Sequence, residues 1–270
     1  YIKDFQSIKG EFELDFEKLS FLYGPNSAGK SSVLDAFSII KKIVTSDNSE
    51  FFEGSTLGFS IELVDDLREI LAYAETGELG ELFSTNGVEA AVREIANKRI
   101  SYRVNGSTAT PNNIEIKANN DFLLAYSNNR QNLLSLLSDY DQEFYKALND
   151  EDLSELFEVD DYPAIAINKS FKHTISLLDD WLDDKYYRDQ IYFREVGNFI
   201  FVDLELCEFL TLTGEVYWSL DNDMSLLSPL ATYFKALKLI FREFFRVNDL
   251  SHVKGDRQVI SVDSFYYKRD

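Results

Sequence analysis

The sequence predicts an α/β fold, and the segments that predict it are a short strand, a glycine-rich loop and an amphipathic helix in the first 45 residues. The run Leu19–Tyr23 is mostly apolar and stops at a glycine, as a buried strand does. Glycines stand at positions 24 and 29, and glycine permits the tight turns that such a loop needs. Apolar residues then recur at helical spacing from Val33 to Val44 (Val33, Ala36, Phe37, Ile40, Ile43 and Val44), with Lys41 and Lys42 near the end.

The loop reads Gly-Pro-Asn-Ser-Ala-Gly-Lys-Ser-Ser and fits the P-loop pattern G-x-x-x-x-G-K-[ST]. The amides of such a loop point inward around a β-phosphate, and the helix directs the positive end of its dipole at the same phosphates. Lys30 would place its charge between the β- and γ-phosphates, as the catalytic residue, and the Ser31 hydroxyl is suited to bind Mg²⁺. A chance match is disfavoured because both flanks are present. The residues predicted to bind ATP are Gly24, Pro25, Asn26, Ser27, Ala28, Gly29, Lys30, Ser31 and Ser32.

Two segments resemble a known family. Pro25-Asn26 followed by Ser-Ala-Gly-Lys-Ser-Ser resembles the GPN-x-x-GKS loop of ABC-type ATPases, in the branch that holds SMC, RecF and OLD-like proteins. Upstream, residues 1–9 and 11–16 resemble the family's opening hairpin, I-x-N-F-K-S-I, and their alternation is itself a strand signal. The resemblance covers residues 1–45. Within this branch, the chain is similar to OLD-like and Septu-type (retron-associated) antiviral-defence ATPases.

This resemblance implies an ABC/SMC-like P-loop NTPase head with a mixed sheet and an inserted helical lobe, acting in the cytoplasm with ATP and Mg²⁺. In this family two heads close face to face over two ATP molecules, so a homo-oligomer is expected. Each composite site takes its P-loop and Walker B acid from one head and its signature serine from the other. Control of an effector nuclease, as a subunit or a domain, is likewise implied by the resemblance alone, with contact to nucleic acid expected only through the complex.

The Walker B acid and the signature are not recognisable in the sequence. The only Asp-Glu pair, Asp150-Glu151, lies in an acidic stretch and not at the end of a buried strand. The best apolar run is Phe199–Asp203, but Leu204 follows where a Glu is needed, and the preceding Gly197-Asn198 favours a β-hairpin over Walker B. Leu212–Glu215 is interpreted as a turn. The chain is therefore interpreted as the N-terminal part of a longer ATPase.

A helix with an apolar face is expected to start at Pro229 and to carry Tyr233, Leu237, Ile240, Phe241, Phe244 and Phe245. It leads to His252–Arg257, which resembles the Gly-Pro-x-Arg-like segment of defence-type members, although Arg257 could equally be an ordinary surface arginine. Basic residues cluster in this part of the chain: Lys235, Lys238, Arg242, Arg246, Lys254 and Arg257. A solvated helix face is favoured for them over a nucleic-acid or partner surface.

The composition is acidic, with 47 Asp and Glu against 27 Lys and Arg and a net charge of −20. This charge disfavours broad, non-specific binding of nucleic acid. The most acidic stretch, residues 139–161, is interpreted as a helical face, with a docking surface for a basic partner as the alternative. No apolar run reaches membrane-spanning length, and the single Cys207 excludes an internal disulfide and fits a reducing cytoplasm.

Three domains are predicted. Residues 1–128 form an ATPase core lobe with the P-loop, residues 129–190 an acidic helical insertion, and residues 191–270 a hairpin and a long helix that returns to the core. Gln131 or Gln142 could serve as a Mg²⁺-contacting glutamine. The expected elements are a strand at 58–64, helices at 65–75, 88–98 and 174–187, and a hairpin of 100–104 with 113–118 around Asn105-Gly106.

The P-loop predicts an ATP-binding protein, and the resemblance implies that it is a subunit of an antiviral defence complex that controls an effector nuclease, hydrolysing ATP when heads pair. Two alternatives stay open. One is a RecF- or SMC-type ATPase of DNA repair or chromosome maintenance, which would require a broad basic surface. The other is a non-hydrolysing scaffold that assembles a complex when it binds nucleotide.

Overall fold

The computed structural model describes residues 1–15, 22–23, 25, 28–45, 54–62, 78–106, 111–140, 146, 164–178, 193–203, 207–208, 217–218, 230, 232–233, 235–237 and 239–241. Among the described residues, a membrane-spanning helix is not found, since none of the helices has the length together with the apolar character that spanning requires.

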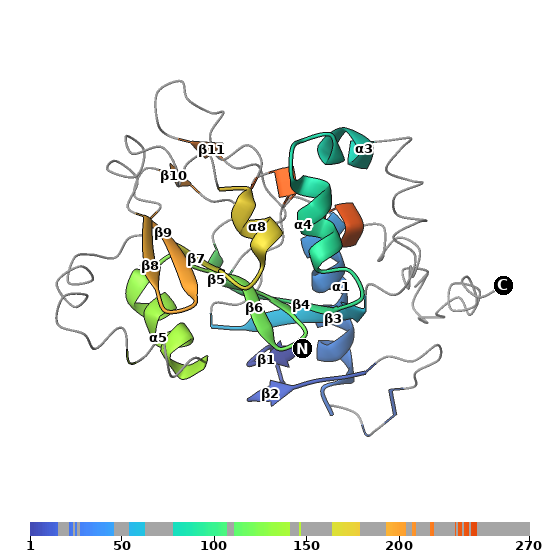
Figure 1. Ribbon diagram of the computed structural model, residues 1–270. Coiled ribbons are helices and arrows are strands. Elements are labelled where there is room, and N and C mark those ends of the chain that lie inside the picture. Colours follow the sequence, from blue (N-terminus) through green and yellow to red (C-terminus); the bar gives the residue numbers. More distant parts are fainter. Residues whose placement is uncertain are drawn as a thin grey trace.

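Nine of the described strands form one sheet in which every pairing is antiparallel (Figure 1). Their order across the sheet is β2-β1-β3-β4-β5-β6-β7-β9-β8. The strands are β1 (Ile2–Lys3), β2 (Glu11–Phe12), β3 (Thr56–Glu62), β4 (Arg99–Gly106), β5 (Pro111–Ala118), β6 (Asp121–Ser127), β7 (Ala164–Asn168), β8 (Phe193–Val196) and β9 (Phe199–Asp203). Two short strands, β10 (Cys207–Glu208) and β11 (Tyr217–Trp218), pair with each other.

The strand β4 shows why this part of the chain forms a sheet with one apolar face. Its residues Ile100, Tyr102 and Val104 are buried, whereas Ser101 and Arg103 between them are partly exposed. Successive side chains of a strand point to opposite faces, so this alternation produces one apolar and one polar face. In the neighbouring strand β3, Phe59 pairs with Tyr102, and their ring centroids lie 5.5 Å apart.

Helices cover the apolar face. The helix α1 (Lys30–Thr45) contributes Val33, Ala36 and Ile40 to the larger hydrophobic cluster, which also takes residues from α4 (Val88–Glu94) and lies against α3 (Glu78–Phe83). The short helix α8 (Lys172–Ser176) lies beside α4. The described residues between 230 and 241 are helical, and Phe241 meets the ring of Phe59 edge-on at 5.2 Å.

The other face is covered only in part. The helix α5 (Arg130–Tyr140) packs Leu133, Leu134 and Leu137 against β6 and β7 in a second, smaller cluster. In Figure 1, α4 and α8 lie above the sheet and α5 lies below its left-hand end. The strands β6 and β7 are therefore enclosed from both sides, which explains why every residue of β7 is buried.

Three buried tyrosines are expected to make the fold less stable at alkaline pH. Burial raises the pKa of Tyr126 to about 12, and it raises the pKa values of Tyr102 and Tyr233 further above the ordinary value of 10. The folded state binds these protons more tightly, so the stabilisation is complete below pH 10 and is lost as the pH rises toward the folded pKa. We expect the free energy of unfolding to fall by about 1.4 kcal/mol per pH unit for each such tyrosine.

Urea unfolding at pH 8, 9, 10 and 11 measures this loss. The variant Tyr102→Phe is the control, because the Tyr102 hydroxyl has no hydrogen-bond partner among the described residues. It should reduce the slope above pH 10 while leaving the protein folded at pH 8. Equal unfolding midpoints at pH 9 and pH 11 would contradict the expectation.

Several predicted elements are confirmed. The opening hairpin forms β1 and β2, the helix after the P-loop forms α1, and the strand predicted at 58–64 forms β3. The hairpin around Gly197-Asn198 forms β8 and β9, with Gly197 at φ 56°. The apolar face of the late helix is confirmed at Tyr233, Leu237, Ile240 and Phe241, which are all buried.

Four details differ from the prediction. Asn105-Gly106 does not form the turn between β4 and β5 but ends β4, where Gly106 has a φ of 92° and the strand register shifts, as at a bulge. The helix predicted at 88–98 ends at Glu94, and Asn97 follows in the left-handed conformation that terminates helices. The helix expected from Thr174 forms as α8, which spans Lys172–Ser176. The range 129–190 is not wholly helical, because it supplies β7 to the middle of the sheet.

The predicted strand Leu19–Tyr23 is also not observed in its two described residues. Leu22 and Tyr23 are exposed and lie outside any strand, because neither pairs with a strand of the described sheet. The helix predicted at 65–75 and residues 179–187 lie outside the described residues, whereas Leu177 and Leu178 form a turn after α8. The three-domain division stays a prediction.

Candidate functional site

The described part of the P-loop forms a tight turn that leads into α1. The N–H of Ala28 donates to the carbonyl of Pro25 at 3.3 Å, and the N–H of Val33 donates to the carbonyl of Gly29 at 3.1 Å. Gly29 has a φ of 82°, a conformation that residues with a Cβ rarely adopt. The second glycine of the motif is thus required by the backbone at the start of the helix. Gly24, Asn26 and Ser27 lie outside the described residues.

The side chain of Lys30 folds back over the loop. Its Nζ donates a hydrogen bond to the carbonyl oxygen of Pro25 at 2.6 Å, which spans five residues of the loop. The ammonium group therefore lies over the turn, at an exposed position. A phosphate oxygen is a better acceptor than this carbonyl, because it carries negative charge and so attracts the ammonium more strongly than a neutral oxygen does.

The first turn of α1 provides the remaining groups that an anion needs. The first amides of a helix have no acceptor within the helix and carry the positive end of its dipole. The first turn of α1 contains no acidic residue, so no carboxylate there competes for these amides. Ser31 is exposed at this end, whereas Ser32 is 5% exposed.

The loop between β1 and β2, residues 4–10, lies directly against the P-loop. We call it the hairpin loop. The hydroxyl oxygens of Ser7 and Ser32 are 2.7 Å apart and share a hydrogen bond. Gln6 Nε2 donates to Asp35 Oδ2 of α1 at 3.1 Å. A Cβ on Gly29 would stand 3.4 Å from Ser7 Oγ, so the hairpin loop packs closely on the second glycine of the motif.

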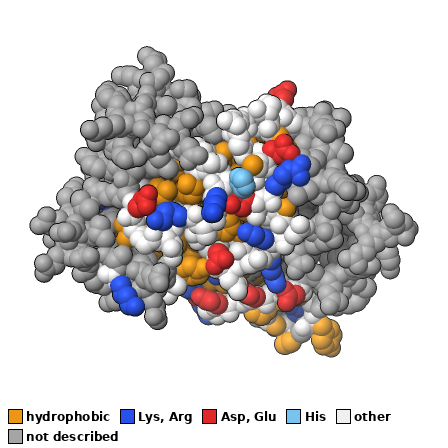
Figure 2. All heavy atoms as spheres, viewed as in Figure 1, with side chains coloured by type: hydrophobic (Ala, Val, Ile, Leu, Met, Phe, Trp, Pro, Cys, Tyr) orange, Lys and Arg blue, Asp and Glu red, His pale blue; other side chains and the backbone are white. Residues whose placement is uncertain are grey.

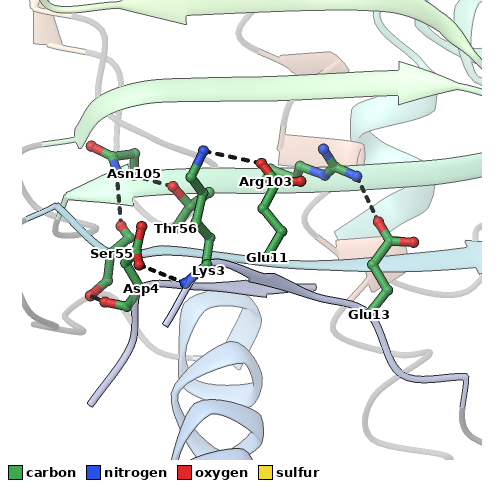
Figure 3. Close-up of polar contacts among 9 residues, drawn as sticks. Lys3, Asp4, Glu11, Glu13, Ser55, Thr56, Arg103 and Asn105 are labelled. Carbon is green, nitrogen blue, oxygen red and sulfur yellow. Dashed lines mark hydrogen bonds and ion pairs between the residues drawn. The ribbon is translucent and has the colours of Figure 1, made fainter. Parts of the chain in front are cut away.

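Hydrogen bonds to the sheet fix the position of the hairpin loop (Figure 3). The hydroxyl of Ser55, just before β3, donates to the carbonyl of Asp4 at 2.8 Å. The amide of Asn105 in β4 donates to the carbonyl of Ser55 at 3.0 Å. After the loop, Glu13 accepts from Arg103 of β4 at 2.9 Å. The strands β3 and β4 therefore determine where the hairpin loop meets the P-loop.

The residues of the P-loop and of the first turn of α1 fit a nucleoside triphosphate with Mg²⁺. The fit rests on the left-handed Gly29, on the ammonium of Lys30 lying over the turn and on the helix start without a carboxylate. Mg²⁺ in such sites is bound by one or two protein oxygens together with phosphate oxygens and water, and the exposed hydroxyl of Ser31 can supply one of them. Among the described residues no group of three or more His, Cys, Asp or Glu could hold a metal ion by itself.

Of the other segments that the sequence analysis weighed for the site, the two that the structure describes, Asp203 and Gln131, do not lie at the P-loop. Asp203 ends β9, and five strands separate β9 from β1, so the two strands lie about 29 Å apart across the sheet at about 4.8 Å per strand. This position fits the hairpin interpretation of residues 199–203 and not a Walker B acid for this P-loop. Gln131 lies on α5, which packs on β6 and β7, away from α1. Asp150-Glu151, Gln142, Leu212–Glu215 and His252–Arg257 lie outside the described residues.

Charges are mixed on the surface that Figure 2 shows, where Lys and Arg side chains alternate with Asp and Glu over the described residues. Of the six predicted basic residues near the end of the chain, Lys235 is described and exposed. The described part of this face therefore offers no broad basic surface.

Sequence reasoning missed Ser7, Gln6 and Asp35 as neighbours of the nucleotide site. The spacing of these residues contains no signal for it, since the Ser7–Ser32 contact spans 25 residues. The one available hint was that the opening hairpin and the P-loop both resemble the same family.

Comparison with known families agrees with this site. A family model described as "AAA domain, putative AbiEii toxin, Type IV TA system" matches residues 19–197, about two-thirds of the chain. The match includes the whole P-loop motif and α1. No curated protein and no solved structure matched the chain. The chain belongs to this family of AAA-type P-loop ATPases and is, as a member, a nucleotide-binding protein.

Proposed function

We propose that this chain is the ATP-binding subunit of an antiviral defence system, of the toxin–antitoxin or abortive-infection kind, and that its nucleotide state controls an effector. The observation that carries the ATP-binding part is the P-loop at the start of α1, with Gly29 left-handed and Lys30 folded over the turn. The defence part is supported by the description of the family and by the resemblance of residues 1–45 to OLD-like and Septu-type ATPases.

Each residue of the loop has a role in this proposal. Lys30 exchanges its bond with the Pro25 carbonyl for phosphate oxygens and neutralises their charge. The first amides of α1 donate to the same phosphates, and the Ser31 hydroxyl is a ligand of Mg²⁺. Bound Mg²⁺ would neutralise charge on the β- and γ-phosphate oxygens. The binding set is Gly24, Pro25, Asn26, Ser27, Ala28, Gly29, Lys30, Ser31 and Ser32.

Hydrolysis requires groups beyond this loop. The proposal takes them from the ABC/SMC-like mode, in which two copies pair face to face over ATP and the second copy completes each site. The second copy would supply the signature serine, whereas the Walker B acid would come from another segment of the same chain, because Asp203 on β9 lies far across the sheet from the P-loop. In the paired state the complex would restrain or release an effector nuclease in the cytoplasm.

Phosphate release by the full-length protein, measured with and without DNA over a range of protein concentrations, tests the proposal. We expect turnover per chain to rise with protein concentration, since pairing is second order, and to be insensitive to DNA. Turnover that depends on DNA would favour the repair-type ATPase instead. Binding of ATP without turnover would favour the assembly scaffold, and absence of ATP binding would overturn the proposal.

A further inference from the structure

The hairpin loop contacts the P-loop through the two hydroxyls of Ser7 and Ser32. Their oxygens are 2.7 Å apart, and Ser32 is only 5% exposed. Ser32 is the third residue of α1 and follows Ser31 in the motif, so it lies in the first turn, where the amides point toward a bound anion. The Ser32 hydroxyl is thus in contact with a residue 25 positions upstream.

Either hydroxyl can donate in this contact, and the two directions leave Ser32 with different bonding capacity. A hydroxyl has one donor and two acceptor sites, whereas a phosphate oxygen only accepts. If Ser32 donated to Ser7, it would have no proton left for a phosphate. If Ser7 donates, the Ser32 oxygen accepts that bond and keeps its own O–H for the nucleotide.

We propose that Ser7 is a positioning residue of the nucleotide site: its hydroxyl donates to Ser32 Oγ and holds the Ser32 hydroxyl in the orientation that donates to a nucleotide phosphate. This inference rests on the proposed function of the P-loop. Ser7 itself does not touch the nucleotide and acts through Ser32.

The hairpin loop is built to hold Ser7 in one place. Phe5 is fully buried, and the N–H of Ile8 donates to the Phe5 carbonyl at 2.9 Å. Asp4 and Gln6 have φ values of 49° and 50°, which non-glycine residues adopt only where surrounding contacts enforce them. The Asp4 carboxylate accepts from the N–H of Gly10 at 2.8 Å. Because Ser7 lies on a loop held this firmly, little conformational freedom is left to lose when nucleotide binds.

A double-mutant cycle tests the inference. The full-length protein is prepared as wild type, Ser7→Ala, Ser32→Ala and the double variant, and affinity for a fluorescent ATP analogue with Mg²⁺ is measured by polarisation. We expect Ser7→Ala to weaken binding about five- to tenfold, which corresponds to one hydrogen bond. In the Ser32→Ala background the same change should have less than about a twofold effect, because Ser7 then has no hydroxyl to orient.

Further variants separate positioning from a structural role. Ser7→Thr keeps the hydroxyl and should restore most of the affinity, while Ser60→Ala, an exposed serine of β3, should leave affinity unchanged. The melting temperature without nucleotide is recorded for each variant. Should Ser7→Ala fail to fold, Ser7→Cys takes its place in the cycle, since a thiol is a weak donor of similar size.

Two results would overturn the inference: an affinity unchanged by Ser7→Ala, or losses from Ser7→Ala and Ser32→Ala that simply multiply. Both are distinct from failure of the proposed function. That failure would appear as wild-type protein that binds no nucleotide, or as undiminished binding by Lys30→Ala.

Discussion

Lys30→Ala is expected to abolish measurable binding of ATP, with affinity reduced by at least about a hundredfold. The change removes the ammonium group that lies over the turn of the P-loop. A charge-assisted hydrogen bond contributes about 1.5–3 kcal/mol, and the ammonium can make more than one to a triphosphate, so the loss exceeds two factors of ten. Fluorescence polarisation of an ATP analogue with the full-length protein measures it.

The matched control is Lys42→Ala in the last turn of the same helix. Lys42 is twelve residues from Lys30, which places it about 18 Å along the helix axis at 1.5 Å per residue. It carries the same charge, so the two variants have equal net charge. We expect Lys42→Ala to bind ATP as wild type does. Equal losses in both variants would indicate non-specific electrostatic attraction in place of a P-loop, and undiminished binding by Lys30→Ala would refute the site.

The sequence was sufficient where the signal is local. The helix α1 follows from apolar residues at helical spacing directly after Gly29, and its position was predicted within a turn. The hairpin of β8 and β9 follows from two alternating runs around Gly197-Asn198. In β4 the alternation of Tyr102 and Val104 with polar residues specifies one buried face. Each of these elements is determined by contacts within a few residues of itself.

The sequence did not predict β7, because burial on both faces removes the alternation of apolar and polar residues that identifies a strand. All five residues of β7, Ala164–Asn168, are buried, because α5 covers one face and the larger cluster the other. A strand buried on both faces shows no period-2 alternation, so this segment was assigned to a helical region. Asn105-Gly106 was misplaced for another reason: the dipeptide that favours turns also favours a bulge, and only the pairing with β5 distinguishes the two.

The candidate site likewise has one part that local sequence predicts and one part that long-range contacts determine. The P-loop motif is contiguous, so its residues could be predicted one by one. The hairpin loop meets it through long-range contacts, Ser7 with Ser32 and Gln6 with Asp35, which no spacing rule predicts. These contacts depend in turn on Ser55 and therefore on how β3 lies in the sheet. The geometry of the nucleotide site is thus a property of the antiparallel sheet as well as of the motif.

Gly58→Val is accordingly expected to cause the largest loss of stability of the changes considered. Gly58 of β3 pairs with Arg103 of β4, and a Cβ at Gly58 would clash with the carbonyl oxygen of Tyr102 and stand 3.0 Å from the Cα of Arg103. These are backbone atoms, so the strands must separate to make room. We expect destabilisation of more than about 3 kcal/mol, at the upper end of overpacking effects, measured as the shift of the urea midpoint.

Two other substitutions, one in the hairpin loop and one in β3, give reference values for Gly58→Val. Gly10→Ala meets nothing within 4 Å but must adopt a φ of 74°, which costs about 1–2 kcal/mol from the backbone alone. Ser60→Ala, two residues along β3, should change stability by less than about 0.5 kcal/mol. A midpoint for Gly58→Val no lower than that of Gly10→Ala would contradict the steric argument. Because Ser55 lies just before β3 and anchors the hairpin loop, any Gly58→Val protein that stays folded should also bind ATP more weakly, which Ser60→Ala should not.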